Sequence, residues 1–364
     1  MKLVIVALGI YSRVGGIERY LQRVIQCMGE DPGPGAVEVV ILWDPPADLP
    51  AAADRVGFTA CHTDKLRFAL AFIRSVLRLK PEVILLGHVL LAPLAGVARL
   101  LSPRSRRLML AYGVEVWGQE SRRGVPWWER QVIRRWVDRI VSISRFTADR
   151  MREYYRLPAD MYSLMPCAVD VGSAPATTLT RRRTGQRLLT VSRLVERYKG
   201  WHQVVRALPE VLQKYPEVEY AVVGEGPLRP ELEALAEQVG VADHVRFMGR
   251  LNAEELERVY ADSDVFVMPS SGEGFGIVFL EAWAHGLPVV AGNRDAAAEF
   301  ITPQVDGLTV DPGSPDEIAK ALLHLLQDPS RAHRMGMEGY RRVREQFSHQ
   351  HFCGALHRML REQG

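Results

Sequence analysis

The sequence has little cysteine, and no two of its cysteines stand close together. Only four occur among the 364 residues, at Cys27, Cys61, Cys167 and Cys353. Because there is no C-x-x-C pair, neither a thiolate zinc site nor a disulfide framework is expected. We therefore expect four reduced thiols, as in a cytosolic protein.

Long apolar runs are also missing. No stretch approaches the ~20 residues that a helix needs to cross a bilayer. Residues 1–9 contain one lysine and a short apolar run, but they lack the small-x-small pattern of a signal-peptide cleavage site. That run favours a buried first strand, and we expect a cytoplasmic protein.

The chain has little net charge, at +3, and the basic residues are unevenly spread. Thirteen arginines lie between Arg104 and Arg156. The segment Trp127–Val141, WWERQVIRRWVDRIV, has helical character with apolar side chains on one face. Such a helix either lies on an anionic membrane, at the inner face of the plasma membrane, or packs on a core with a solvated basic side. No nucleic-acid partner is expected.

What the sequence does contain is a regular alternation of short apolar runs and longer amphipathic ones. The predicted strands are Leu3–Leu8, Val37–Leu42, Val83–Leu86, Leu108–Ala111, Ile140–Ile143, Leu188–Val191, Tyr220–Val223, Val245–Met248, Val265–Met268 and Pro288–Ala291. Helices are predicted at Ile17–Met28, Lys65–Leu79, Val204–Lys214, Pro230–Val239 and Glu254–Ala261. Unbroken Val/Ile/Leu runs are typical of strands that are buried on both faces. This alternation predicts an α/β protein with two doubly wound units.

One stretch, residues 171–186, is rich in Ser, Thr, Ala, Gly and Arg and has no apolar periodicity. We place an interdomain linker there. The predicted organisation is an N-terminal Rossmann-like domain at 1–170, the linker, and a C-terminal Rossmann-like domain at 187–345. The last residues, 346–364, are expected to form a helix that packs back on the N-terminal domain.

The strongest local signal is the segment 269–281, PSSGEGFGIVFLE, which follows the predicted strand Val265–Met268. Its glycines let the backbone turn sharply and approach a ligand closely. A helix is predicted from Ile277 to Ala284, so free N–H groups and the helix dipole would point at an anion. Two carboxylates, Glu273 and Glu281, suit sugar hydroxyls because each accepts several hydrogen bonds.

A second signal is the segment 191–200, VSRLVERYKG, which follows another apolar run. Arg193 and Lys199 stand close to the end of that predicted strand. Two cations there would clamp a diphosphate without a metal. A solvated basic turn is the alternative when this segment is taken alone.

Taken together, these segments resemble glycosyltransferase family 4, whose GT-B fold has two facing Rossmann-like domains with a cleft between them. The resemblance extends over nearly the whole chain and is densest from Leu188 to Asp311. The matching features are Gly15-Gly16, Ser192-Arg193, Lys199-Gly200, Val223-Gly224-Glu225-Gly226-Pro227, Phe247-Met248-Gly249, Glu273-x7-Glu281 with Gly274-Phe275-Gly276, and Ala284-His285-Gly286-Leu287-Pro288.

The resemblance implies roles in the second half of the chain. Arg193 and Lys199 would bind the donor diphosphate, and Glu273 would hold hydroxyls of the donor sugar. Further donor contacts would come from Gly274, Phe275, Gly276, Glu281, Arg250 and Leu251, with Glu281 on the ribose and Arg250 and Leu251 against the base.

In the first half, the resemblance assigns Gly15 and Gly16 to a loop that closes on the donor phosphates. Many relatives carry histidine where Tyr112 stands, so a histidine role does not transfer. Tyr112 and Glu115 are expected to contact the sugar or the acceptor. Cys167-Ala168 replaces a usual Asn-Gly pair, and Cys167 receives no role.

The function implied is a retaining transfer of a hexose-type sugar from a UDP- or GDP-sugar to a glycan or lipid-linked acceptor, in bacterial surface polysaccharide synthesis. No cofactor and no metal are expected. The D-x-D sequence at 262–264 precedes a predicted strand, so a metal site there is not expected. Two alternatives remain open, a GT-B sugar-nucleotide epimerase and a non-catalytic nucleotide-sugar-binding protein.

Overall fold

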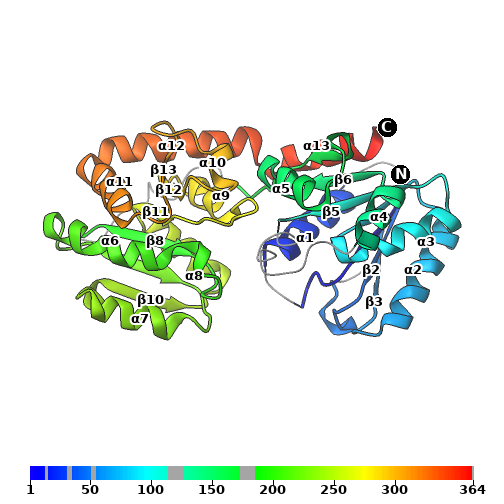
Figure 1. The fold of residues 1–364 in the computed structure, drawn as a ribbon, viewed down its shortest axis with the longest axis horizontal. Coiled ribbons are helices and arrows are strands. Elements are labelled where there is room, and N and C mark those ends of the chain that lie inside the picture. The colour runs from blue at the N-terminus through cyan, green and yellow to red at the C-terminus, as the bar shows by residue number, and fades with distance from the viewer. Residues whose placement is uncertain (13–14, 31–34, 51–54, 114–126, 173–184, 363–364) are drawn as a thin grey trace. The chain divides into compact units, whose positions relative to one another are not determined.

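The computed structural model of the chain describes residues 1–12, 15–30, 35–50, 55–113, 127–172 and 185–362. Two compact units are present (Figure 1). The first unit comprises Met1–Cys167 and His349–Gly364, and the second comprises Ala168–Ser348. The chain therefore crosses from one unit to the other twice. Most of the predicted linker lies outside the described residues.

A parallel sheet forms the centre of the first unit. Its strands are β1 (Lys2–Ala7), β2 (Ala36–Ile41), β3 (Val56–Ala60), β4 (Val83–Leu86), β5 (Arg106–Ala111), β6 (Arg139–Ser142) and β7 (Tyr162–Leu164). They lie in the order β3-β2-β1-β4-β5-β6-β7. The order reverses between β1 and β4, which is the position where doubly wound sheets bind ligands.

Helices pack on this sheet through apolar faces. They are α1 (Gly16–Glu30), α2 (Lys65–Leu79), α3 (Pro93–Leu101), α4 (Trp127–Trp136), α5 (Arg145–Tyr155) and α13 (His349–Arg361). One core cluster joins Phe72 of α2, Ala95 of α3 and Ile133 of α4 to strand residues such as Val4 and Ile84. Helices α2, α3 and α4 therefore form one layer, with α3 packed against both neighbours.

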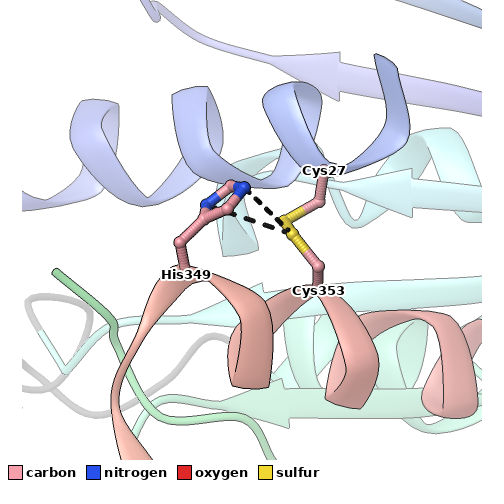
Figure 2. A group of neighbouring side chains, drawn as sticks. All are labelled: Cys27, His349 and Cys353. Atoms are coloured by element: carbon pink, nitrogen blue, oxygen red, sulfur yellow. Dashed lines mark hydrogen bonds between the residues drawn. A yellow bond between two sulfur atoms is a disulfide. The ribbon is translucent and has the colours of Figure 1, made fainter. Parts of the chain in front are cut away.

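The C-terminal helix α13 belongs to the first unit, where it packs on α1. The expectation of four reduced thiols is wrong for one pair. Cys27 of α1 and Cys353 of α13 form a disulfide with 5.2 Å between their Cα atoms (Figure 2). The two cysteines are 326 residues apart in sequence, so only the fold brings them together. Cys61 and Cys167 are buried and are not part of a disulfide.

The second unit has a parallel sheet of the same kind. Its strands are β8 (Arg187–Val191), β9 (Glu219–Val223), β10 (Val245–Gly249), β11 (Val265–Met268), β12 (Val289–Gly292) and β13 (Gly307–Val310). Their order is β10-β9-β8-β11-β12-β13, with the reversal between β8 and β11. The carboxyl ends of all these strands meet at one edge because every pairing is parallel.

Helices cover the second sheet as well. They are α6 (Trp201–Lys214), α7 (Arg229–Gln238), α8 (Ala253–Ala261), α9 (Ile277–Ala284), α10 (Ala297–Phe300), α11 (Pro315–Gln327) and α12 (Pro329–Gln346). Trp201 of α6 and Leu322 of α11 are completely buried in one core cluster with the β8–β9 strands. Among the described residues, no helix is long and apolar enough to span a membrane.

One predicted helix ends earlier than expected. The segment Trp127–Val141 forms α4 only as far as Trp136, because β6 begins at Arg139 and pairs with β5. The aspartates at 262 and 264 serve a structural purpose. Asp262 forms an ion pair with the buried Arg187, and Asp264 accepts a hydrogen bond from the Arg187 backbone N–H at 2.7 Å.

Candidate active site

The predicted donor residues of the second unit lie at the carboxyl edge of its sheet. Loops that leave β8 and β11 flank the point where the strand order reverses. In doubly wound proteins this position binds nucleotides and phosphates. The two motifs that the sequence places about 80 residues apart thus become neighbours through strand order alone.

The loop after β8, residues 192–200, is held against the end of β9. The backbone N–H of Ser192 donates to Val223 O at 3.0 Å, and that of Leu194 donates to Glu225 O at 2.9 Å. Gly224 has a φ of +129°, and a Cβ there would collide with the carbonyl of Ser192. Glycine is therefore required at Gly224 both for its conformation and for the close approach.

The same loop contacts the loop after β11. Ser271 N donates to Tyr198 O at 2.9 Å, and the Tyr198 ring packs where a side chain on Gly272 would stand. Gly200, at φ +81°, lies so close to Pro269 O that a Cβ would not fit. The two segments thus pack together into one surface.

On this surface Lys199 and Glu273 form an ion pair between largely buried side chains, which are 16% and 12% exposed. Burial by itself would lower the pKa of Lys199, but the charge of Glu273 and its hydrogen bond outweigh burial and keep that pKa raised. Lys199 is therefore a fixed positive charge at the edge of the sheet.

The structure does not place Arg193 in that pair. Its guanidinium donates to Glu196 at 2.9 Å, and the side chain is 66% exposed. Arg193 and Lys199 still act on the same group, the hydroxyl of Tyr198. Burial raises the pKa of Tyr198 to about 12, while the positive charges of Lys199 and Arg193 oppose that rise.

The N-terminus of α9 lies immediately after Glu273. Gly276 caps the helix with a φ of +92°, and a Cβ there would collide with the Phe279 ring. Phe275 is buried and stacks on Phe300 with 4.9 Å between ring centroids. Gly274 and Gly276 thus border a short helix whose first N–H groups have no side-chain cap.

The remaining predicted donor residues lie on neighbouring elements. Glu281 sits on α9, where its carboxylate accepts a hydrogen bond from the Tyr260 hydroxyl at 2.9 Å. Arg250 is exposed and Leu251 is half-buried, and both follow β10. Gly249 ends that strand at φ +67° and accepts a hydrogen bond from Gly224 N at 2.8 Å.

Sequence reasoning missed one residue of this site, Asp295. It follows β12 and is 3% exposed. Its carboxylate accepts hydrogen bonds from Ser270 Oγ at 2.6 Å, from Glu273 N at 2.9 Å and from Ala297 N at 3.1 Å. An aspartate among small residues carried no motif, so nothing in the sequence marked Asp295.

The first unit holds its own glycine-rich loop, after β1. Gly15 precedes α1, which begins at Gly16, and Gly15 O accepts a hydrogen bond from Arg19 N at 3.0 Å. Asp44 is completely buried and was also missed. Its carboxylate accepts hydrogen bonds from Ile10 N, Tyr11 N, Ser12 N and Ser12 Oγ.

Two further predicted contacts belong to the first unit. Tyr112 is buried and packs edge-on against Tyr20, with 5.6 Å between ring centroids. Glu115 lies outside the described residues. Two other residues that follow strands of this sheet have structural roles. Ser144 caps α5 by accepting from Thr147 N, and His88 accepts from Leu90 N.

A glycine-rich turn, a buried cation and a helix N-terminus at a switch point define a nucleotide- or phosphate-binding α/β protein. A family model described as "Glycosyl transferases group 1" matches residues 179–342, and one described as "Glycosyltransferase Family 4" matches residues 14–173. The chain belongs to glycosyltransferase family 4 and is a glycosyltransferase.

Individual proteins agree with this assignment. A GDP-mannose-dependent alpha-(1-6)-phosphatidylinositol monomannoside mannosyltransferase from Mycobacterium tuberculosis is 38% identical, over 68% of this chain and 68% of that protein. A GDP-mannose-dependent monoacylated alpha-(1-6)-phosphatidylinositol monomannoside mannosyltransferase from Corynebacterium glutamicum is 34% identical, over 58% of this chain and 59% of that protein. HepE from Anabaena, solved with UDP, has the same fold with a TM-score of 0.80 at 17% identity, over 99% of both chains. The predicted GT-B fold is confirmed.

Proposed function

We propose that the chain is a retaining hexosyltransferase that uses a GDP-sugar, with GDP-mannose as the first donor to test. The observation that carries this proposal is the Lys199–Glu273 pair beside the N-terminus of α9 at the strand-order reversal. The names of the mycobacterial and corynebacterial relatives support GDP-mannose over a UDP-sugar.

The chemistry follows from where charge develops. As the sugar leaves the nucleotide, negative charge builds on the departing diphosphate, and fixed positive groups stabilise that transition state. Lys199 and the positive N-terminal end of α9 supply this charge, and Arg193 adds to it once it leaves Glu196. Glu273 accepts hydrogen bonds from hydroxyl groups of the donor sugar. The diphosphate oxygen itself accepts the acceptor's proton, so that the new bond forms on the face that the leaving group occupied.

Because protein groups supply the positive charge, we propose that no metal takes part. Turnover is expected to stay unchanged after dialysis against EDTA. Complete loss, restored by Mg²⁺ or Mn²⁺, would contradict this expectation.

The donor is tested by binding and by turnover. A ligand that binds only the folded chain raises its melting temperature. GDP-mannose and GDP are expected to raise it more than UDP-glucose and UDP do. Release of GDP only in the presence of an acceptor distinguishes a transferase from an epimerase and from a non-catalytic binder. The one-bond coupling between C1 and H1 of the transferred sugar reports retention.

The acceptor is proposed to be a lipid-linked glycan on an anionic membrane, and the outer surface of the α2–α3–α4 layer supports this. Leu66, Leu70 and Leu77 of α2 are each at least half exposed, as are Trp127 and Trp128 of α4. Basic residues stand between them, which are Lys65, Arg67, Arg74, Arg78, Arg134 and Arg135. Apolar and basic side chains mixed on one helical surface suit a membrane interface.

Vesicle flotation tests the membrane surface. The protein is expected to float with vesicles that contain phosphatidylglycerol at low salt and to remain behind with neutral phosphatidylcholine vesicles. Leu70→Glu should weaken flotation, while the matched Val305→Glu change at an exposed apolar position of the second unit should not. Equal recovery with both vesicle types would contradict a charge-dependent membrane surface.

A further inference from the structure

The loop after β12 holds the backbone of Glu273 from two sides. Asp295 accepts a hydrogen bond from Glu273 N at 2.9 Å, and Ala296 N donates to Glu273 O at 3.2 Å. Ser270, at the start of the same segment, donates its hydroxyl to Asp295 at 2.6 Å. The peptide units that set the direction of the Glu273 side chain are therefore fixed by groups on the neighbouring strand end.

We infer that Asp295 is a positioning residue that aims Glu273 at the donor sugar, and this inference rests on the proposed function. All its described hydrogen-bond partners are protein groups, namely Ser270, Glu273 and Ala297. It acts through the Glu273 backbone, whereas Lys199 holds the Glu273 carboxylate at the other end. With both ends held, Glu273 keeps one orientation before the donor arrives, which lowers the cost of binding the sugar.

The charges around Asp295 give its role a signature near neutral pH. Burial, aided by the negative charge of Glu273, raises the pKa of Asp295 to about 7. Lys199 forms its ion pair with Glu273. Arg294, which directly precedes Asp295 in the chain, forms an ion pair with Asp311 at 2.6 Å. Neither of these two cations is therefore directed at Asp295. The Asp295 carboxyl group gains or loses its proton close to neutral pH.

Asp295→Asn tests the inference. The amide keeps the size of the carboxyl group but turns one acceptor into a donor, so either Glu273 N or Ala297 N loses its partner. The variant is expected to bind GDP within about twofold of the wild type but GDP-mannose roughly tenfold more weakly. The pH dependence of kcat/KM between pH 6 and 8 is expected to flatten. Asp316→Asn, an exposed change on α11, is the matched control and should alter neither property.

Each outcome decides the matter. If the wild type discriminates between GDP-mannose and GDP and Asp295→Asn discriminates equally well, Asp295 does not position Glu273. Equal losses for both ligands would show a merely structural role. If the wild type binds no nucleotide sugar, the proposed function fails together with this inference. Should Asp295→Asn not fold, Ser270→Ala removes one Asp295 partner and is expected to give a smaller loss for GDP-mannose alone.

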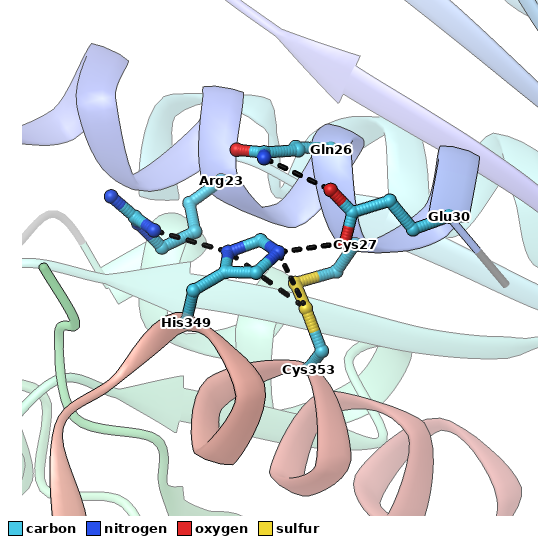
Figure 3. Close-up of a disulfide and its surroundings, with 6 residues drawn as sticks. All are labelled: Arg23, Gln26, Cys27, Glu30, His349 and Cys353. Atoms are coloured by element: carbon cyan, nitrogen blue, oxygen red, sulfur yellow. Dashed lines mark hydrogen bonds and ion pairs between the residues drawn. A yellow bond between two sulfur atoms is a disulfide. The ribbon is translucent and has the colours of Figure 1, made fainter. Parts of the chain in front are cut away.

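A different observation, the Cys27–Cys353 disulfide, carries a second inference. Figure 3 shows its surroundings, where Arg23 and Glu30 of α1 flank His349 of α13. His349 is the first residue after the chain returns to the first unit. The disulfide therefore fastens α13 to α1 one turn after the crossing.

The Cys27, His349 and Cys353 ligand atoms lie within 4.8 Å of one another, which raises the question of a metal site. Both sulfurs are bonded to each other, so neither is a thiolate. One nitrogen of His349 faces Glu30 at 2.7 Å and the other faces the Arg23 guanidinium at 3.0 Å. A cation beside the ring and the shared disulfide bond both disfavour a metal ion.

We propose that this disulfide is a redox-controlled fastening of α13. The thiolate of a dithiol reductant attacks Cys353 Sγ, which is half-buried, whereas Cys27 is completely buried. The bond to Cys27 breaks, and the Cys27 sulfur takes up a proton. The second thiol of the reductant then releases Cys353, so two electrons pass to the protein and the reductant ends as a disulfide. After reduction, α13 is held only by non-covalent contacts, among them those of buried Phe352, Leu356 and Leu360.

Hydrogen exchange on the full chain tests this proposal. Dithiothreitol is expected to speed exchange at residues 349–361 by roughly tenfold, and Cys27→Ser should show the faster rate with or without reductant. Cys61→Ser, which changes a buried free thiol, should keep the wild-type response. An exchange rate at residues 349–361 that does not change with dithiothreitol would overturn the proposal. So would reduced protein that binds one equivalent of Zn²⁺ and regains protection, since the cluster would then be a metal site.

Discussion

Both units hold a loop with a predicted role in donor binding, and in each unit a buried aspartate from the end of a neighbouring strand accepts hydrogen bonds from that loop. In the first unit, Asp44 follows β2 and accepts hydrogen bonds from the loop after β1. In the second unit, Asp295 follows β12 and accepts hydrogen bonds from the loop after β11. The strand order places each aspartate beside its loop, because β2 lies next to β1 and β12 lies next to β11.

The difference lies in what surrounds each aspartate. Asp44 is bound by three backbone N–H groups and the Ser12 hydroxyl. Asp295 stands beside a second carboxylate, Glu273, which is paired with Lys199. A buried aspartate can thus order a loop in two ways, with or without taking part in a charged network. We expect changes at Asp44 to affect mainly folding stability, and changes around Asp295 to affect the reaction and the pH dependence of stability.

The largest expected effect separates the charged site from the rest of the chain. Lys199→Ala removes a fixed positive charge that would stabilise the negative charge developing on the leaving diphosphate. We therefore expect kcat/KM to fall by roughly 10²–10³-fold. Circular dichroism should show an unchanged fold. Lys214→Ala, at an exposed lysine that ends α6, is the matched control. Near-normal turnover in Lys199→Ala would contradict the assigned role.

Asp44→Ala tests the other side of the comparison. It leaves the N–H groups of Ile10, Tyr11 and Ser12 without their carboxylate acceptor, so the free energy of unfolding should fall by about 3 kcal/mol. Denaturant titration measures the change, with Asp48→Ala at an exposed position as the control. A loss below about 0.5 kcal/mol, the usual scatter of surface substitutions, would show that Asp44 does not order the loop.

The pH dependence of stability sharpens the comparison further. Because the folded-state pKa of Asp295 is about 7, above its usual value, the folded chain binds this proton more tightly than the unfolded chain. The resulting stability is fully present below the unfolded-state pKa and is lost as the pH rises towards 7. In the wild type, the free energy of unfolding should fall by on the order of 2 kcal/mol between pH 5 and pH 8 because of Asp295. Denaturant titrations of Asp295→Asn should no longer show this fall. Parallel slopes in the variant and the wild type would contradict this expectation.

The smallest expected effect concerns Glu281. Glu281→Gln keeps the shape of the side chain but weakens the hydrogen bonds that it accepts from hydroxyl groups. The KM for the donor should therefore rise by roughly tenfold, with kcat little changed. Tyr260→Phe removes its 2.9 Å partner and should produce a smaller rise. If kcat falls instead of KM rising, Glu281 acts in the transition state rather than in ribose binding.

Several elements could be predicted from the sequence with their observed bounds. These are the strands Val83–Leu86 and Val265–Met268 and the helices Lys65–Leu79 and Ile277–Ala284. In each, apolar content or periodicity identifies the element without help from distant residues. The strands β3, β7 and β13 were missed because they are short or interrupted by glycine and polar residues, and partner strands are needed to define them.

The candidate site was also predicted only in part. Lys199 and Glu273 were placed correctly at the ends of two buried strands, and the structure brings them together. The pairing of Arg193 with Glu196 was not foreseen, since a cation chooses among carboxylates by three-dimensional distance. Cys27 and Cys353 were expected to be reduced because sequence spacing cannot show that α13 returns to α1.

The sequence by itself determined the alternation of strands and helices, the two doubly wound sheets and the family, because these depend on local apolar patterns and short motifs. Only the tertiary structure decided which side chains meet. Asp44, Asp295 and the Cys27–Cys353 disulfide all join elements that the strand order or helix packing brings together. Contacts of this kind depend on distances in space between residues that are far apart in the chain, and a pattern along the sequence does not contain those distances.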